Sequence, residues 1–180
     1  MSEPRWLSDD EQRIWRDFAQ ATAMLHAHLE GQLQHDSGMP HTYYEVLVSL
    51  SEAEGRRLRM SELAAVRSSS RSRLSHAVTR LEAKGWVRRE SCPTDKRGAW
   101  AVLTDEGFHA LEEAAPGHVG AVRESLFDPL DAAQVAALGE ISAAILAGLR
   151  PRCAAAAAAE EAAGLTPEPA PAGAEPPESG

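Results

Sequence analysis

The apolar residues of segment 71–104 change their spacing part-way along, and this change limits the folds open to the chain. From Arg71 to Lys84 apolar side chains recur every three or four residues, as on one face of a helix. Gly85 follows, at a place where helices often end on a left-handed residue. Then "WVRRES" and "AWAVLT" alternate with period two around a loop that contains Pro and Gly. A helix followed directly by a β-hairpin is therefore predicted.

The remaining segments are predicted to be mainly helical. Ser8 and Glu11 form an S-x-x-E capping box, and apolar residues follow at intervals of three and four until about His35. A bend is expected near Pro116 in a later helix. Further helix starts are expected at the capping residues Thr42, Ser61, Thr104 and Asp131. With "RRLRM" as a short strand, the expected fold is mostly α with a small β-wing.

The composition of the chain limits the cellular compartment in which the protein is expected. The chain has 180 residues, enough for one domain with appendages. No stretch is expected to reach the ~20 apolar residues of a membrane span, and "MSEPRWLSDDEQR" is not a signal peptide. Cys92 and Cys153 do not make a disulfide framework. We therefore expect a cytoplasmic protein, associated with the nucleoid if it binds DNA, and no membrane partner.

Charge is distributed unevenly along the sequence. Residues 56–97 hold twelve Lys and Arg against four acids, a net of +8, whereas the remainder holds six against twenty-three, a net of −17. The two values together give the formal charge of −9. A basic block within an acidic protein is typical of a site for a polyanion.

This basic block coincides with a predicted helix-turn-helix. The two helices within 61–84 are joined by a tight turn, and the hairpin behind them matches a wing. If Leu74, Val78 and Leu81 are buried, the opposite face of the second helix carries hydroxyls and guanidiniums with no acid before Glu82. Such side chains donate to phosphate oxygens and base edges. The predicted DNA-contacting residues of this helix are Ser70 as N-cap, Arg71, Ser72, Arg73, Ser75, His76 and Arg80.

Three motifs in register resemble the winged-helix core of the MarR (multiple-antibiotic-resistance regulator) family of bacterial transcription factors. The family pattern is "RLE-x-x-G" at the end of the recognition helix, "D-x-R" at the wing tip and "LT-x-x-G" at the next helix. Here they are Arg80-Leu81-Glu82 with Gly85, Asp95-Lys96-Arg97, and Leu103-Thr104 with Gly107. The turn Arg67-Ser68-Ser69 departs from the usual apolar-Gly-apolar pattern. The resemblance spans about residues 8–150 and implies a DNA-binding regulator.

The wing tip is assigned a role by this resemblance. Arg97 is expected to enter the minor groove, and Asp95 to hold its guanidinium in place. A planar guanidinium pairs well with a carboxylate, and a narrow minor groove concentrates negative potential. Lys96 is expected to add a phosphate contact.

The family also implies a homodimer. Apolar stripes on the first helix and the last two exceed what one small winged helix would cover. A two-fold dimer places two recognition helices one DNA turn apart, roughly 34 Å, on a pseudo-palindromic operator. The expected organisation is a dimerisation helix and linker (1–41), a winged helix-turn-helix core (42–104), C-terminal dimerisation helices (105–150) and an Ala- and Pro-rich disordered tail (151–180).

An effector is implied as well. Small aromatic or phenolic ligands bind between the dimer helices and the winged helix in this family, and the candidate contacts here are His28, His41, Tyr43 and Tyr44. Each of these is also a plausible structural residue. No cofactor and no metal site is expected.

Three alternatives remain open at this point. In the first, the winged helix is a protein-docking module. In the second, the regulator senses a metal through His26 and Glu30, which stand at i, i+4 spacing. In the third, Cys92 beside basic residues is a redox-sensing thiolate. An enzyme is not expected, because no nucleophile–base pair, phosphate loop or paired metal motif is recognisable.

Overall fold

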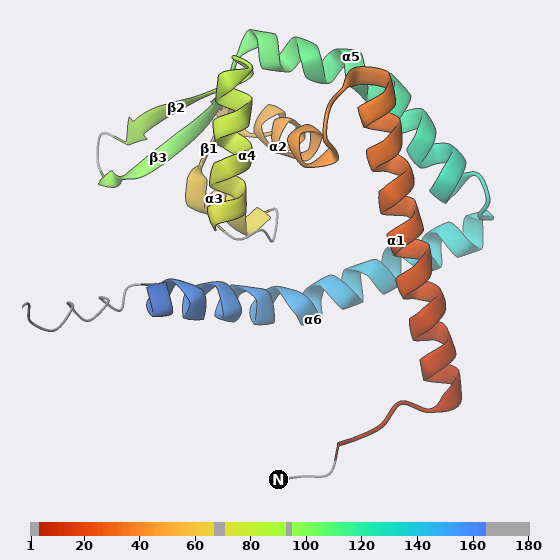
Figure 1. The fold of residues 1–180 in the computed structure, drawn as a ribbon. Coiled ribbons are helices and arrows are strands. Elements are labelled where there is room, and N and C mark those ends of the chain that lie inside the picture. The colour runs from red at the N-terminus through yellow and green to blue at the C-terminus, as the bar shows by residue number, and fades with distance from the viewer. Residues whose placement is uncertain (1–3, 67–70, 93–94, 165–180) are drawn as a thin grey trace, which may run out of the picture. The chain divides into compact units, whose positions relative to one another are not determined.

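The computed structural model describes residues 4–66, 71–92 and 95–164 (Figure 1). Their contacts divide the chain into two units, Met1–Gly139 and Glu140–Gly180, which are described separately. The first unit contains α1 (Asp9–Ser37), α2 (His41–Ser51), the 3-10 turn η1 (Glu54–Arg56), β1 (Arg57–Arg59), α3 (Met60–Val66), α4 (Arg71–Ala83), β2 (Val87–Cys92), β3 (Asp95–Leu103), α5 (Asp105–Val122) and the π-turn η2 (Arg123–Phe127). The last helix, α6 (Ala132–Gly164), starts in the first unit and continues into the second.

The winged helix-turn-helix core has a three-stranded antiparallel sheet with the order β1-β3-β2. In this register Ala101 of β3 lies between Leu58 of β1 and Arg89 of β2. The sheet, helices α2 to α5 and the C-terminal end of α1 enclose an apolar core. Its fully buried large side chains are Leu33, Met39, Val46, Leu47, Leu50, Leu63, Val78, Leu81 and Val87. The predicted fold, mostly α with a small β-wing, is confirmed.

Two helix ends agree with the sequence pattern. The Ser8 hydroxyl accepts a hydrogen bond from the Glu11 N–H at 3.2 Å, and the Glu11 carboxylate accepts one from the Ser8 N–H at 2.7 Å. This capping box lowers the pKa of Glu11 through the hydrogen bonds from Ser8. At the last helix, Asp131 and Gln134 cap each other's N–H groups in the same way.

Thr104 joins the recognition helix to α5. Its hydroxyl donates to the Gly85 carbonyl at 2.7 Å and accepts from the Gly107 N–H at 3.0 Å. Gly85 has φ +74°, the left-handed value that favours glycine. A Cβ on Gly107 would lie 2.1 Å from the Trp86 carbonyl oxygen, so only glycine fits there. The "LT-x-x-G" motif therefore records a close contact between the start of α5 and the end of α4.

Two predicted helix starts are wrong. Helix α2 begins at His41, one residue before the predicted cap at Thr42, because the Glu30 carboxylate of α1 accepts the His41 N–H at 2.9 Å. Helix α3 begins at Met60, so Ser61 lies inside it. The preceding N–H, on Arg59, donates to the Glu62 carboxylate at 3.0 Å. In both places a glutamate supplied the acceptor that a hydroxyl was expected to give.

Two further predictions, a bend in α5 and a loop position for Asp95, Lys96 and Arg97, also differ from the structure. Helix α5 is continuous through Pro116, where a bend was expected, and its irregular turn follows later at Arg123–Phe127. Strand β3 starts at Asp95, so Asp95, Lys96 and Arg97 lie on a strand and not in a loop between strands. The predicted turn Arg67-Ser68-Ser69 lies outside the described part of the chain.

Helix α6 differs most from expectation. It continues through Pro151 to Gly164, over residues that were expected to be disordered. Six alanines after Cys153 explain this extension, since alanine has the highest helix propensity. Within α6, Ala132–Cys153 has a mean hydropathy of 1.6 and no burial, so by length and composition it qualifies as a membrane span. The expectation that no stretch was apolar enough was wrong.

Candidate nucleic-acid interface

The recognition helix α4 is fixed in the core by one face. Leu74, Val78 and Leu81 are at most 2% exposed, as predicted. The predicted DNA-contacting residues whose side chains are described all lie exposed on the rest of its surface: Ser72, Arg73, Ser75, His76 and Arg80. The core side chains therefore set which arc of α4 is presented to a partner.

Arg89 on β2 ties the wing to one edge of this arc. Its guanidinium donates to the Glu82 carboxylate at 2.6 Å, to the Thr79 hydroxyl at 3.2 Å and to the Ser75 carbonyl at 2.9 Å. The Arg89 N–H also donates to Glu82, at 3.0 Å. The Ser75 hydroxyl accepts from Arg89 at 3.3 Å and keeps its own hydrogen to donate. We call these contacts the Arg89 clamp.

The Arg89 clamp was missed from the sequence, where Arg89 and Glu82 were counted only as charges. The position of Arg89 on its strand is a signal that could have indicated the clamp. Side chains two apart on a strand share a face, and Val87 is 2% exposed, so Arg89 is directed toward the protein. A charge on that face requires a partner, and Glu82 is the acid at the end of the recognition helix.

A second group of basic side chains lies along β1 and is held by aromatic rings. The Arg57 and Arg59 guanidiniums lie 5.0 and 5.2 Å from the centre of the Trp100 ring. Arg56 lies 3.8 Å from the centre of the Phe108 ring and bonds to Asp105 at 3.2 Å. Cation–π contacts restrict where a flexible arginine points. These contacts therefore orient positive charge at β1 and the turn before it.

Part of the predicted interface lies outside the described residues. This holds for Ser70 and for the side chains of Arg71, Asp95, Lys96 and Arg97. The backbone is described at the wing, where Cys92 pairs with Asp95 after an irregularity between Ser91 and Cys92. The minor-groove role of Arg97, its support by Asp95 and the redox role of Cys92 all remain predictions.

The four predicted effector contacts do not form one site. His28 is exposed on α1. His41 and Tyr44 lie against His118 of α5, with ring centres 5.5 and 4.3 Å from it. Burial lowers the pKa of His118 and raises that of Tyr44. Tyr43 is directed elsewhere, toward α4.

The metal alternative has no geometric support in the described part of the chain, where no three His, Cys, Asp or Glu side chains are placed to share an ion. Glu30 instead accepts the His41 N–H. The His26 ring lies 5.2 Å from the His41 ring, edge to face.

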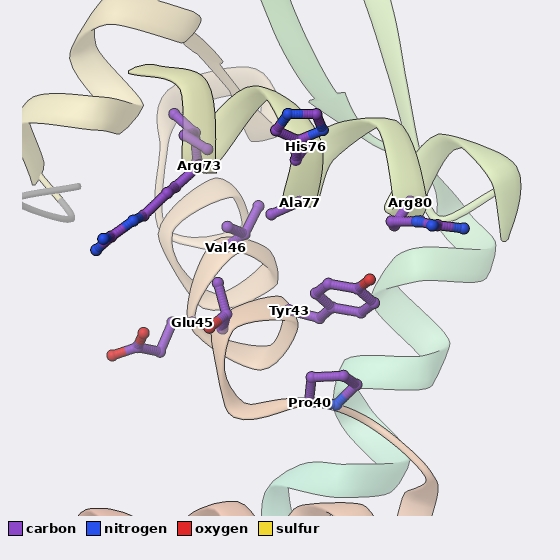
Figure 2. Close-up of a pocket in the computed structure, with 10 residues that line it drawn as sticks. Pro40, Tyr43, Glu45, Val46, Arg73, His76, Ala77 and Arg80 are labelled. Carbon is purple, nitrogen blue, oxygen red and sulfur yellow. The ribbon is translucent and has the colours of Figure 1, made fainter. Parts of the chain in front are cut away.

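A groove of about 570 Å³ lies between α2 and α4 (Figure 2). Three exposed side chains of α4 form one rim: Arg73, His76 and Arg80. The remaining lining residues are Pro40, Thr42, Tyr43, Glu45, Val46, Leu74 and Ala77. The groove thus shares this rim with the predicted DNA-contacting face.

Known proteins with this architecture decide the family. The family model described as "MarR family" matches residues 37–98. Sco3205 from Streptomyces coelicolor, a MarR family transcriptional regulator solved in complex with DNA, is 56% identical, with 83% of this chain and 93% of that chain covered and a TM-score of 0.79. The chain belongs to the MarR family. AbsC, another MarR family transcriptional regulator from Streptomyces coelicolor, is 42% identical over 82% of this chain and 99% of its own, with a TM-score of 0.77.

A curated relative of this MarR-family chain is the transcriptional repressor MprA of Escherichia coli K12, with 30% identity over 79 residues. That alignment covers 44% of this chain and 45% of MprA, so the chain spans about half the length of the relative. The recognition helix, the wing strands and the appended helices of the structure are accordingly those of a MarR-family winged helix.

Proposed function

We propose that this protein is a sequence-specific DNA-binding transcriptional regulator, acting as a ligand-responsive repressor. The observation that carries the proposal is the exposed face of α4, which presents Ser72, Arg73, His76 and Arg80 with no acidic side chain. Glu82, at the end of the same helix, is paired with Arg89. The DNA complex of the similar Sco3205 and the repressor activity of MprA support this function.

We further propose that it acts as a homodimer on a pseudo-palindromic operator. Large apolar side chains are exposed on α1 and α6, among them Ile14, Trp15, Phe18, Ile141, Ile145 and Leu149. Such surfaces require a cover, and a second copy of the chain supplies one without any further partner. A dimer that forms without detergent would also explain the apolar α6 without a membrane.

The test is fluorescence anisotropy on the DNA upstream of the protein's own gene, beside a shuffled duplex. We expect the native duplex to bind more tightly. The Arg80→Ala variant should weaken binding about tenfold and lower the slope of log K against log salt by about 0.9 per lost phosphate contact. Arg123→Ala removes an exposed arginine outside the winged helix and serves as the control.

The outcomes separate the hypotheses. Equal binding of both duplexes would remove this promoter as the target and require a genome-wide site search. If neither duplex binds at low salt, the DNA-binding function is wrong and a protein-docking role replaces it. If Arg80→Ala and Arg123→Ala behave alike, the recognition helix is not the contact.

A further inference from the structure

We propose that Arg89 of the wing fixes what two side chains of the recognition helix can read: Ser75 donates to a base acceptor, and Thr79 presents its methyl group to a thymine. A serine hydroxyl can donate or accept, so the sequence leaves the base preference of Ser75 open. The inference rests on the proposed function and deepens it, because it names the base features that α4 recognises beside the wing.

The hydroxyl of Thr79 is fully used inside the protein. It donates to the Ser75 carbonyl at 2.9 Å and accepts from both terminal nitrogens of the Arg89 guanidinium, each at 3.2 Å. A hydroxyl has one hydrogen and two lone pairs, and all three are engaged here. Thr79 is nevertheless exposed, so the group that it offers a partner is its methyl. In the major groove, an apolar contact of this kind recognises the C5-methyl of thymine.

The hydroxyl of Ser75 is only partly used. It accepts from the Arg89 guanidinium at 3.3 Å, and within the described residues no hydrogen bond uses its own hydrogen. A base that approached its second lone pair as a donor would meet the guanidinium charge, whereas an acceptor is attracted by that charge. Ser75 is therefore a donor. Guanine offers it two acceptors, N7 and O6, whereas cytosine offers the N4 amino donor.

Arg89 takes this position without DNA. Its guanidinium donates to the Glu82 carboxylate at 2.6 Å, and its backbone N–H donates to the same carboxylate at 3.0 Å. Both side chains are 30% exposed, so the pair is partly shielded from water. Charge-assisted bonds of this kind fix the direction of the planar guanidinium. Arg89 acts through Ser75 and Thr79 and is a positioning residue.

The spacing of the two side chains predicts the spacing of the bases. Ser75 and Thr79 are four residues apart on one edge of α4, which is ~6 Å along a helix that rises about 1.5 Å per residue. Base pairs are stacked about 3.4 Å apart. The acceptor and the thymine are therefore expected within about two base pairs of each other.

The first experiment selects duplexes from a random library with the full-length protein and sequences them. The unmodified protein should disfavour cytosine about tenfold at one position, and Ser75→Ala should remove this preference. Arg89→Met should reduce it to about threefold or less, because Ser75 is then free to accept. Arg89→Lys should relax it as well, since the charge beside Glu82 remains and only the fork is lost. This variant covers the case in which Arg89→Met does not fold.

The control for these variants is Arg88→Met. Arg88 is an exposed neighbour on β2 and pairs with Glu90, outside the Arg89 clamp. Its loss should leave every base preference as it is. A purely structural role of Arg89 would lower the affinity for all duplexes alike, without a change at one position.

The second experiment separates the methyl group of Thr79 from its hydroxyl. Thr79→Val keeps a methyl and loses the hydroxyl, whereas Thr79→Ser does the opposite. Replacing the selected thymine by deoxyuridine removes the base methyl. Anisotropy should show that this replacement weakens binding of the unmodified protein and of Thr79→Val about fourfold, the factor for about one buried methyl group. Binding of Thr79→Ser should not respond to it.

The opposite pattern overturns the inference. Sensitivity to deoxyuridine in Thr79→Ser but not in Thr79→Val would mean that the hydroxyl is the reader. A cytosine penalty that persists in Ser75→Ala, or in both Arg89 variants, would show that the Arg89 clamp does not set the readout. A sequence selected by all variants alike contradicts this inference and leaves the proposed function standing. If the unmodified protein selects no sequence, the proposed function fails and the inference fails with it.

Discussion

At the scale of single residues, Arg89 fixes how the wing meets the recognition helix. Its guanidinium contacts three residues of α4, including a carboxylate, and none of these contacts involves the core. A lysine has one compact ammonium and does not reproduce this fork. Arg89 is therefore a positioning residue, engaged by the protein before any DNA arrives.

Removing the clamp should affect both stability and specificity. We expect Arg89→Ala to lower the free energy of unfolding by about 1–2 kcal/mol, since several hydrogen bonds to a partly exposed charge are lost. It should reduce discrimination between native and shuffled duplexes more than it reduces binding to the shuffled one. Arg88→Ala, which removes an exposed neighbour paired with Glu90, is the control for urea denaturation. Equal stability losses in the two variants would show that the Arg89 clamp contributes no more to the free energy of unfolding than the exposed Arg88–Glu90 pair.

His118 gives the fold a dependence on pH. Burial lowers its pKa in the folded state, and among the described residues its buried Nδ1 has no hydrogen-bond partner. The unfolded chain, with a histidine pKa of about 6.5, then takes up a proton more readily than the folded one. Stability should therefore fall as pH drops below about 6.5, and His118→Gln should flatten this dependence. Urea titrations between about pH 7 and pH 5 measure it, and an unchanged slope in the variant would exclude His118 as the cause.

At the scale of elements, Thr104 and Gly107 set the approach of α5 to the end of α4. Thr104 satisfies groups on both helices, and Gly107 allows the Trp86 carbonyl to approach. Because backbone atoms are in contact there, the packing cannot adjust by a change of rotamer. The start of α5 is therefore less tolerant of substitution than its middle.

A pair of glycine substitutions in α5 tests this difference. Gly107→Ala places a Cβ against backbone and should destabilise the protein by about 1–3 kcal/mol or more. Gly120→Ala meets nothing within 4 Å and should stabilise it by up to about 1 kcal/mol, through helix propensity alone. Denaturation at one fixed protein concentration compares them. The same loss in both variants would contradict the close-contact explanation.

The sequence predicted the elements better than their boundaries. Periodicity located the buried side chains Leu74, Val78 and Leu81 because a helix face depends only on local spacing. The start of α2 depended instead on Glu30, a residue eleven positions before His41, and local capping rules do not include such contacts. The groove between α2 and α4 was not predicted either, because it forms where two helices meet and local sequence rules do not describe such contacts.

At the scale of the whole molecule, the chain separates basic from apolar surface along its length. Positive charge is concentrated in residues 56–97, whereas exposed large apolar side chains cluster on α1 and α6. Ile141, Ile145 and Leu149 recur every four residues on α6, which forms one stripe of that helix. This pattern is typical of a chain that binds a polyanion through its basic residues and packs against another protein surface through its apolar ones.

A charge placed in the apolar stripe should prevent assembly. We expect Ile145→Glu to shift the protein from dimer to monomer in sedimentation equilibrium without detergent, because a carboxylate would be buried unpaired. Ala147→Glu adds the same charge on the opposite side of α6 and should leave the dimer intact. A monomeric unmodified protein, or dissociation by both variants, would contradict the assignment of this stripe to a homodimer.

The contact that links Gly85, Thr104 and Gly107 has a consequence for protein engineering. These residues belong to the motifs that resemble the family pattern, and their hydrogen bonds join them to one another. The exposed arc of α4 is separate from them, so its residues should tolerate substitution without a change in the fold. Grafting positions 72, 73, 76 and 80 from a relative, with this contact and the Arg89 clamp retained, should transfer operator preference while the host fold is inherited unchanged.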